Sequence, residues 1–304
     1  MDEALGHVLS RRRLLGVGAA AAALVATRPF AGVAAAKQCT ATVKDTDISI
    51  QLFTTLLLAN ASPEATLTAL REIGYTKVEH AGFGSAVTAA NFRTACDNAG
   101  IKCTSGHMTI GHPYNDTAWK TTVEDALTVG QIYINAASKS AGGNTKKDWI
   151  AYARTLNKAG AVARKEGIKH IGHHCHGGEW QPVDDDPKLR PVDILVKYTN
   201  PKHVHVQNDL GWCFSVTDPV PQLKKFPGRF WQFHVKDMRG GFPTYPGTGE
   251  IGPDGFRRMF GAAKESKQPG LTELIIEQDA AATGLEAAKL GWDMLHGMEY
   301  SYKC

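Results

Sequence analysis

The stretch FWQFHVKD, residues 230–237, decides the fold. It follows a Pro-Gly pair and begins with mostly apolar residues, which predicts a short buried strand that starts after a turn. An imidazole (His234), an ammonium (Lys236) and a carboxylate (Asp237) stand at its C-terminal end. Side chains two residues apart in a strand point to the same face, so we expect His234 and Lys236 to share one face.

Seven more short runs of this kind occur in the chain, each followed by a longer helical pattern. They cover residues 48–53, 77–82, 103–108, 131–136, 169–176, 204–211 and 271–278. Alternating strands and helices predict parallel strands, and eight such units in about 250 residues are typical of a (β/α)8 barrel. We therefore predict fold class α/β, a single (β/α)8 TIM barrel with apolar strand interiors. A doubly wound open sheet is the alternative.

Residues 1–36 differ in composition from the rest of the chain. Ser10-Arg11-Arg12-Arg13 precedes an alanine-rich apolar run over 16–26, and Ala34-Ala35-Ala36 offers a small-residue cleavage site. This arrangement predicts a cleaved export signal, and the paired arginines resemble a twin-arginine signal. The apolar run is too short and alanine-rich to span a membrane well. We expect an exported, periplasmic or secreted protein, with residues 37–304 as one domain and no membrane span left after cleavage.

Charge and cysteine content exclude several classes of protein. Removing residues 1–36 lowers the formal net charge from +4 to +2, and no Lys/Arg run is interleaved with aromatic residues, so nucleic acid is not an expected partner. The six cysteines have no C-x-x-C spacing, which argues against a zinc or redox motif. An exported protein can form disulfides, and a bridge between Cys39 and Cys304 at the two ends is one of several pairings open to this chain.

Ionisable side chains recur where the predicted strands end. In a (β/α)8 barrel these C-terminal ends form the active site. Buried charges need partners, and one divalent cation can satisfy several of them. We expect His174, Asp209, His234 and Glu277 to bind a divalent metal ion such as Mn, Zn, Co, Fe or Mg, although the residues leave its identity open. The full set of ionisable strand ends is Glu79, His107, His174, His176, Asp209, His234, Lys236 and Glu277.

The chain resembles the sugar phosphate isomerase/epimerase family, whose members have a xylose isomerase-like TIM barrel. The resemblance covers nearly all of residues 45–300. It is carried in order by Glu72-Ile73-Gly74-Tyr75 with Val78-Glu79, Ser105-Gly106-His107, Asp209-Leu210-Gly211-Trp212, Pro227-Gly228-Arg229 with His234-Val235-Lys236-Asp237, Gly249-Glu250-Ile251 and Ile276-Glu277-Gln278-Asp279.

The resemblance implies a metal shell of one ligand from the fifth strand followed by Asp209, His234 and Glu277. The fifth strand departs from many relatives: His174, His176 and Glu179 keep the family's two histidines and its acid, whereas the tyrosine and asparagine positions hold other residues. His174 is therefore either a metal ligand or a substrate contact.

The remaining polar strand ends have a catalytic and a structural interpretation. We expect Glu79, His107 and Lys236 to be catalytic acid–base groups, and the pKa of Lys236 to fall beside a metal ion. We expect His176, Glu179 and Trp212 to bind substrate. The alternatives are a structural acid for Glu79, a side chain that reaches solvent or pairs with Asp237 for Lys236, and core packing for Trp212. With the metal ligands His174, Asp209, His234 and Glu277, ten residues are assigned to the site.

The resemblance implies a small carbohydrate substrate and proton abstraction next to a carbonyl. The expected activity is a metal-dependent isomerase or epimerase that works through an enediolate. The alternatives are a sugar lyase or dehydratase, for example one that eliminates from a keto-glycoside, and a non-catalytic metal-containing sugar-binding protein. The sugar, its phosphorylation and the oligomeric state stay open.

Overall fold

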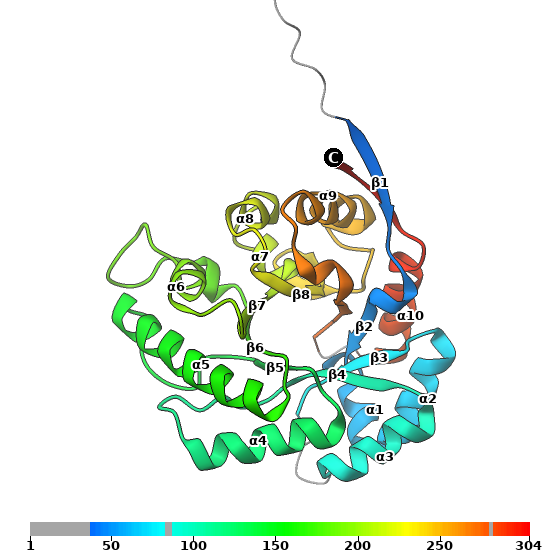
Figure 1. The fold of residues 1–304 in the computed structure, drawn as a ribbon. Helices are drawn as coiled ribbons and strands as arrows, with labels where there is room; N and C mark the ends of the chain where they lie inside the picture. Colours follow the sequence, from blue (N-terminus) through cyan, green and yellow to red (C-terminus); the bar gives the residue numbers. More distant parts are fainter. Residues whose placement is uncertain (1–36, 83–86, 280–281) are drawn as a thin grey trace, which may run out of the picture. The chain divides into compact units, whose positions relative to one another are not determined.

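The computed structural model describes residues 37–82, 87–279 and 282–304. Within them, eight parallel strands close into a barrel in the order β11-β2-β3-β4-β5-β6-β7-β8 (Figure 1). The predicted (β/α)8 barrel is confirmed. An open doubly wound sheet is wrong because β11 pairs with β2 as well as with β8, which closes the ring. The predicted export signal, residues 1–36, lies outside the described residues.

Each barrel strand overlaps the run predicted for it from the sequence. The barrel strands are β2 (Ile48–Gln51), β3 (Lys77–His80), β4 (Lys102–His107), β5 (Tyr133–Ala136), β6 (His170–Cys175), β7 (Val204–Asp209), β8 (Phe230–Val235) and β11 (Leu274–Ile276). The α-helices are α1 (Leu56–Ala61), α2 (Pro63–Ile73), α3 (Ala89–Ala99), α4 (Asp116–Val129), α5 (Lys146–Glu166), α6 (Pro191–Tyr198), α7 (Leu210–Phe214), α8 (Pro219–Lys225), α9 (Gly252–Glu265) and α10 (Gly284–Leu295). A short antiparallel pair, β9 (Asp237–Arg239) and β10 (Phe242–Thr244), follows β8.

The inside of the barrel is polar, so the prediction of apolar strand interiors is wrong. Side chains alternate between two faces along a strand. Ile50 and Val78 belong to the apolar core that contains residues of the surrounding helices. Their neighbours Gln51 and Glu79 are fully buried and hydrogen-bond to one another between adjacent strands. The apolar residues of the runs thus pack outward against helices, and the polar residues between them fill the barrel.

Gly172 on β6 makes room for this polar interior. A Cβ at this position would collide with Asn135 Oδ1 and His205 Nε2. His205 Nε2 lies 3.2 Å from Gln232 Oε1, and the imidazole of His205 is fully buried. Burial lowers the pKa of His205 to about 3. His205 is therefore a neutral histidine at ordinary pH.

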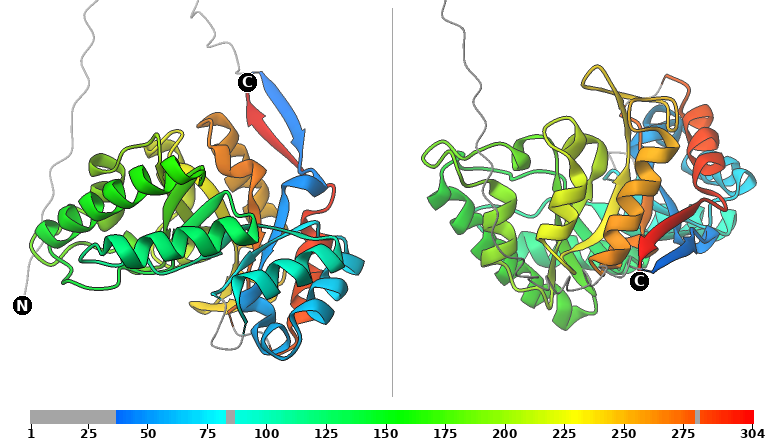
Figure 2. Two further views of the ribbon diagram at one scale, coloured as in Figure 1. Left: turned by 60° about the horizontal axis from the view of Figure 1, so that its bottom comes forward. Right: turned by 90° about the horizontal axis from the view of Figure 1, so that it is seen from above.

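The two ends of the described chain form a small sheet that the sequence did not predict. β1 (Gln38–Thr42) pairs antiparallel with β12 (Glu299–Lys303), and β12 packs against α9 (Figure 2). A disulfide joins Cys39 to Cys304 across this pair, so the bridge between the chain ends is confirmed. The other four cysteines are buried and free. In the described part of the chain, no helix has the length and apolar character needed to cross a membrane.

Removing the disulfide should destabilise the protein. It joins residues 265 positions apart, and a bridge that closes a long loop restricts the unfolded chain. We expect the double variant C39S/C304S to lose about 2–4 kcal/mol of unfolding free energy, measured by denaturant titration. A reductant should destabilise the wild type to the same extent and leave the double variant unchanged. Equal unfolding midpoints for the two proteins would contradict a structural role for the bridge.

Stability should fall as the pH drops below about 6.5. His205, with its pKa lowered to about 3, stays neutral in the folded protein while the unfolded chain takes up its proton. This histidine alone should add about 1.4 kcal/mol per pH unit to the slope of unfolding free energy between pH 6 and 4.5. The H205Q variant, which keeps a donor for Gln232, should lose that contribution. The exposed H296Q variant is the control and should keep the wild-type slope.

Candidate metal centre and active site

Four of the predicted metal ligands meet at the C-terminal end of the barrel. His174 lies on β6, Asp209 ends β7, His234 lies on β8, and Glu277 follows β11. All four are buried, and one nitrogen or oxygen ligand atom from each lies within 4.8 Å of those of the other three. His107, at the end of β4, forms a second such group with His174 and His234. Closure of the barrel therefore brings together side chains from strands that are far apart in the sequence.

His234 lies between two carboxylates. Its Nδ1 is 2.6 Å from Glu277 Oε2, and its Nε2 is 2.7 Å from Glu79 Oε1. Burial disfavours the charged ring, but the charges of Glu277 and Glu79 outweigh burial and raise the pKa of His234 to about 10. A metal ion binds a ring nitrogen that has lost its proton, so a metal ion bound to His234 would displace a proton from it.

Lys236 lies among three carboxylates. Its ammonium is 2.9 Å from Asp209 Oδ2, 3.0 Å from Glu277 Oε2 and 2.9 Å from Asp279 Oδ1. Burial disfavours the ammonium, but these three charges outweigh burial and raise the pKa of Lys236 above its ordinary value. The fall in this pKa that we expect beside a metal ion stays a prediction. The alternative pairing with Asp237 is not seen, because Asp237 accepts hydrogen bonds from the backbone of Gly249 and Ile251.

Asp209 has two contacts, one on each carboxylate oxygen. Its Oδ1 accepts a hydrogen bond from the backbone nitrogen of Trp212 and caps the N-terminus of α7, whereas its Oδ2 faces Lys236. Glu277 contacts both cationic side chains, because His234 and Lys236 lie next to the same oxygen, its Oε2. Burial alone would raise the pKa of Glu277, but Lys236 and His234 hold it well below its ordinary value. Both carboxylates thus lie beside a positive charge.

Glu79 is the centre of the polar barrel interior. Its two oxygens accept five hydrogen bonds, from Gln51, Ser105, Asn135, Gln207 and His234, at 2.5–3.2 Å. Burial opposes ionisation of Glu79, but the neighbouring imidazoles of His107 and His234 and the hydrogen bonds outweigh it and lower its pKa to about 2. Glu79 is therefore a saturated carboxylate beneath the site, which favours the structural interpretation over direct acid–base catalysis.

The polar residues that surround Glu79 were missed by the sequence reasoning. They are Gln51, Ser105, Asn135, Gln207 and Gln232, all fully or almost fully buried. A signal was present for three of them, because Gln51, Asn135 and Gln232 are single amides between apolar residues of their strands. Amide and hydroxyl side chains carry no charge, so a search for ionisable groups passes over them.

His174 is buried and neutral. Burial first, and then the positive charge of His234, lower the pKa of His174 well below its ordinary value. A neutral imidazole is the form that coordinates a metal ion. The His107 ring stacks parallel to that of His234, with ring centroids 5.4 Å apart. The rings of His107 and His174 thus both lie next to the ring of His234.

The three predicted substrate contacts divide into one accessible and two supporting residues. His176 lines the main cavity. Glu179 is buried, accepts a hydrogen bond from the backbone nitrogen of His176 at 2.8 Å and contacts His173 Nε2 at 3.0 Å. Trp212 is partly exposed, with the Lys236 ammonium 5.3 Å and the His176 ring 6.2 Å from its ring centroid. These contacts favour supporting roles for both residues. Glu179 supports the loop that carries His176, and Trp212 supports Lys236.

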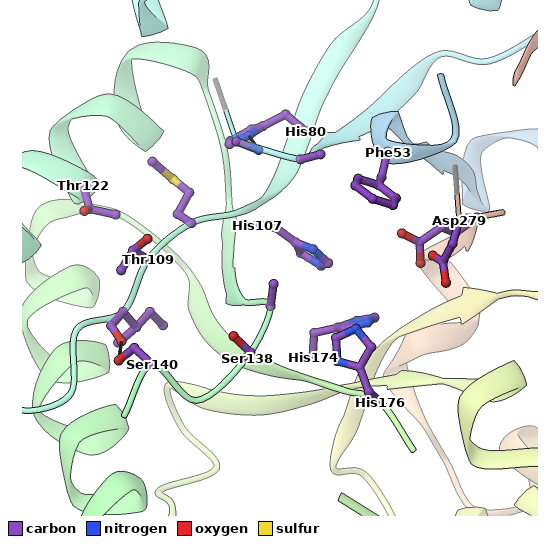
Figure 3. A pocket seen from close by; sticks show the side chains of 16 residues that line it. Phe53, His80, His107, Thr109, Thr122, Ser138, Ser140, His174, His176 and Asp279 are labelled. Carbon is purple, nitrogen blue, oxygen red and sulfur yellow. Dashed lines mark hydrogen bonds between the residues drawn. The ribbon is translucent and has the colours of Figure 1, made fainter. Parts of the chain in front are cut away.

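A cavity of about 610 Å³ opens above the cluster. At one side it is lined by Phe53, His107, His174, His176, Glu277 and Asp279, and Figure 3 shows the imidazoles and Asp279 directed toward the same space. Thr109, Thr122 and Ser140 line the opposite side. Among the described lining residues there is no lysine or arginine. Asp279 contacts Lys236 from within this cavity and is a site residue that the sequence reasoning did not assign.

The donor set fits a divalent cation. Two imidazoles and two carboxylates are ligands suited to Zn, Mn, Co or Fe. Four carboxylates, those of Glu79, Asp209, Glu277 and Asp279, lie around the cationic side chains of His234 and Lys236. This excess of acidic groups in a buried place would be relieved by a divalent ion.

The fold and the site define a (β/α)8-barrel protein with a metal-competent cluster at the C-terminal ends of its strands. The chain belongs to the xylose isomerase-like TIM barrel family, whose sequence profile matches residues 67–294. This family is one of TIM barrel enzymes that act on sugars.

Curated relatives resemble part of the chain. It is 30% identical over 166 residues to an inosose dehydratase of Clostridium tetani, a match that covers 47% of this chain and 52% of the relative. An inosose dehydratase of Clostridium perfringens is 29% identical over 165 residues, again 47% of this chain and 52% of the relative. The chain thus spans about half the length of the curated relatives it matches.

Solved structures share the fold. A sugar phosphate isomerase/epimerase from Parabacteroides distasonis superposes with a TM-score of 0.69 at 20% identity, covering 82% of this chain and 93% of that one. A probable 3-DHS dehydratase from Bacillus anthracis superposes with a TM-score of 0.59 at 10% identity, covering 81% and 97%. At these identities the likeness establishes the barrel and not the reaction.

Replacing Glu79 by glutamine should be strongly destabilising. The amide would present a donor where several donors converge, and His234 would lose one of its two carboxylate partners. Removing one partner of a buried ion pair costs about 3–5 kcal/mol, and we expect a loss of that size for E79Q in denaturant unfolding. The control is E72Q on the exposed side of α2, which should change stability by less than about 0.5 kcal/mol. Equal stabilities of E79Q and E72Q would contradict the central role of Glu79.

Proposed function

We propose that the protein is a metal-dependent lyase that eliminates water or an alcohol from a neutral keto-sugar or keto-polyol. The observation that carries this proposal is the cluster of His174, Asp209, His234 and Glu277 at the floor of a cavity that further acid–base groups line. The dehydratase names of the curated relatives favour elimination over the isomerase or epimerase activity expected from the sequence.

The metal would be held by His174, Asp209, His234 and Glu277 and, when bound, would act as a Lewis acid toward the carbonyl of the substrate. His107, His176 and Asp279 reach the same cavity and are the groups placed to accept or donate a proton. One of them removes the proton from the carbon next to the carbonyl. The C–H electron pair becomes a carbon–carbon double bond as the β C–O bond breaks, and a second group protonates the departing oxygen.

Lys236, Glu79 and Glu179 have supporting roles in this proposal. Lys236 holds the side chains of Asp209 and Glu277 in place through its ion pairs. Glu79 orients His234 from below, and Glu179 fixes the backbone at His176. These residues thereby hold the groups that line the cavity in place.

The cavity favours a substrate without phosphate. Its described lining contains no lysine or arginine that could pair with a phosphate, whereas Glu277 and Asp279 are acidic. Its volume of about 610 Å³ leaves room for a substituent beyond a single ring, on the side of Thr109, Thr122 and Ser140. A glycoside of a keto-sugar and a free keto-polyol are both compatible with this space.

We also propose that residues 1–36 export the folded protein by the twin-arginine route. The arginines at 11–13, the apolar run and the small residues at 34–36 support this proposal. The disulfide between Cys39 and Cys304 is consistent with an oxidising compartment. Fractionation of cells that express the wild type or an R11K/R12K variant tests it, since only the wild type should reach the periplasm or medium.

Elimination is tested by incubating metal-free and metal-loaded protein with a panel of inososes, keto-sugars and keto-glycosides. We expect loss of water or of an alcohol, read as product mass, only with the metal-loaded protein. The E277Q variant should lower kcat/KM by about 10²–10³-fold, because it removes a ligand and the charge next to Lys236. The matched control is E273Q, at the opposite end of the same strand, which loses an ion pair with Lys77 and should keep the wild-type kcat/KM.

The other outcomes identify the rival functions. A product with the mass of its substrate, with deuterium incorporated from solvent, would identify an isomerase or epimerase, in which the same carbanion is reprotonated on carbon. Saturable sugar binding without turnover of any panel member would identify a binding protein. Either result would contradict the lyase proposal.

A further inference from the structure

The side-chain amide of Gln207 contacts two histidines of the site at once. Gln207 lies on β7 and is fully buried. Its Oε1 is 2.8 Å from His107 Nε2 and 3.0 Å from His174 Nδ1. Its Nε2 is 2.7 Å from Glu79 Oε2 and 3.2 Å from Gln232 Oε1. One amide therefore connects the buried carboxylate below the site to both imidazoles above it.

The orientation of this amide follows from its partners. Glu79 already receives hydrogen bonds from Gln51, Ser105 and His234, so its carboxylate acts as an acceptor. The carbonyl oxygen of Gln232 is also an acceptor. The Gln207 NH₂ group must therefore face Glu79 and Gln232. Its carbonyl oxygen then faces the two histidines, and an amide oxygen can only accept.

We propose that Gln207 is a positioning residue that sets the tautomers of His107 and His174. Because both rings must donate to the same oxygen, His107 carries its proton on Nε2 and His174 carries its proton on Nδ1. The electron pairs of His107 Nδ1 and His174 Nε2 are left available. Which nitrogen of a histidine binds a metal ion is set by the hydrogen bond that the other nitrogen makes.

These tautomers give each histidine a defined function. The functions named here rest on the proposed metal-dependent lyase. His174 presents Nε2 as a metal ligand, and His107 presents Nδ1 as an acceptor for a substrate hydroxyl proton or as a further ligand. Without Gln207, the neutral His174 ring would divide its population between two tautomers, whereas His107 Nε2 would keep Glu79 Oε1, 3.3 Å away, as a second acceptor. Only one of the two would have the electron pair on the required nitrogen.

The tautomer of a neighbouring histidine, His205, follows from its hydrogen-bond partner in the same way. Gln232 Oε1 accepts from Asn135 and from Gln207, so His205 must donate its Nε2 proton to that oxygen. Its Nδ1 is then an electron-pair donor, and this buried atom has no hydrogen-bond partner among the described residues. Gln207 and His205 thus both donate to Gln232 Oε1, in agreement with the orientation assigned to the Gln207 amide.

The test uses full-length protein, free of metal, with Q207L as the variant and Q51L as its matched control. Gln51 is equally buried, and its Nε2 also donates to Glu79, at 2.8 Å. Among the described residues it has no hydrogen bond to His107 or His174. Both variants remove one amide donor from the same carboxylate, so a loss caused by that carboxylate alone should appear in both.

Long-range ¹H–¹⁵N NMR spectra of the histidine rings report the tautomers directly, with signals assigned through H107Q and H174Q. We expect wild type and Q51L to show His107 protonated on Nε2 and His174 on Nδ1, and Q207L to show averaged signals for His174, because His107 keeps Glu79 as an acceptor. Zn²⁺ or Co²⁺ affinity, measured by competition with a chromophoric chelator, should fall about 10–100-fold in Q207L and by much less in Q51L.

Three results would overturn the assignment of Gln207. They are opposite tautomers in the wild type, which needs no variant to fold, an unchanged His174 tautomer in folded Q207L, and equal losses of metal affinity in Q207L and Q51L. Wild-type tautomers as assigned together with no binding of Zn²⁺ or Co²⁺ would support the role of Gln207 and contradict the metal-dependent function. The two proposals therefore fail separately.

Discussion

The structure depends on one buried carboxylate. Glu79 accepts hydrogen bonds from side chains of β2, β4, β5, β7 and β8, so its two oxygens connect most of the barrel wall. A buried charge is stable only when it is paired and fully hydrogen-bonded, and this requirement determines which residues can fill the barrel. The amides and hydroxyls around Glu79 are thus a consequence of its charge. They also form the floor on which the site rests.

The site above this floor is a balance between carboxylates and cationic side chains. His234 and Lys236 supply positive charge beside Asp209, Glu277 and Asp279. The donor set fits a divalent ion, whose binding would take a proton from His234 and redistribute these ion pairs. A divalent ion at this place would therefore compete with His234 and Lys236 for the same carboxylates.

The strand–helix alternation and the positions of the ionisable strand ends could be predicted from the sequence, because both are local properties of short segments. The ring order and the meeting of His174, Asp209, His234 and Glu277 followed from the barrel geometry. The polar interior was not foreseen. An alternate Gln or Asn in a short strand looks like a solvent-facing residue until the closure of the barrel places it inside.

The sequence by itself determined the class of fold, the set of acids and imidazoles at the strand ends, and the family to which they point. Only the tertiary structure decided which of these groups reach the cavity and which lie beneath it. Glu79 and Asp279 show the difference, since the first is enclosed by five donors and the second opens to the cavity beside Lys236. The physical reason is that charge and hydrogen-bonding capacity belong to a residue, whereas burial and partners come from segments far away in the chain.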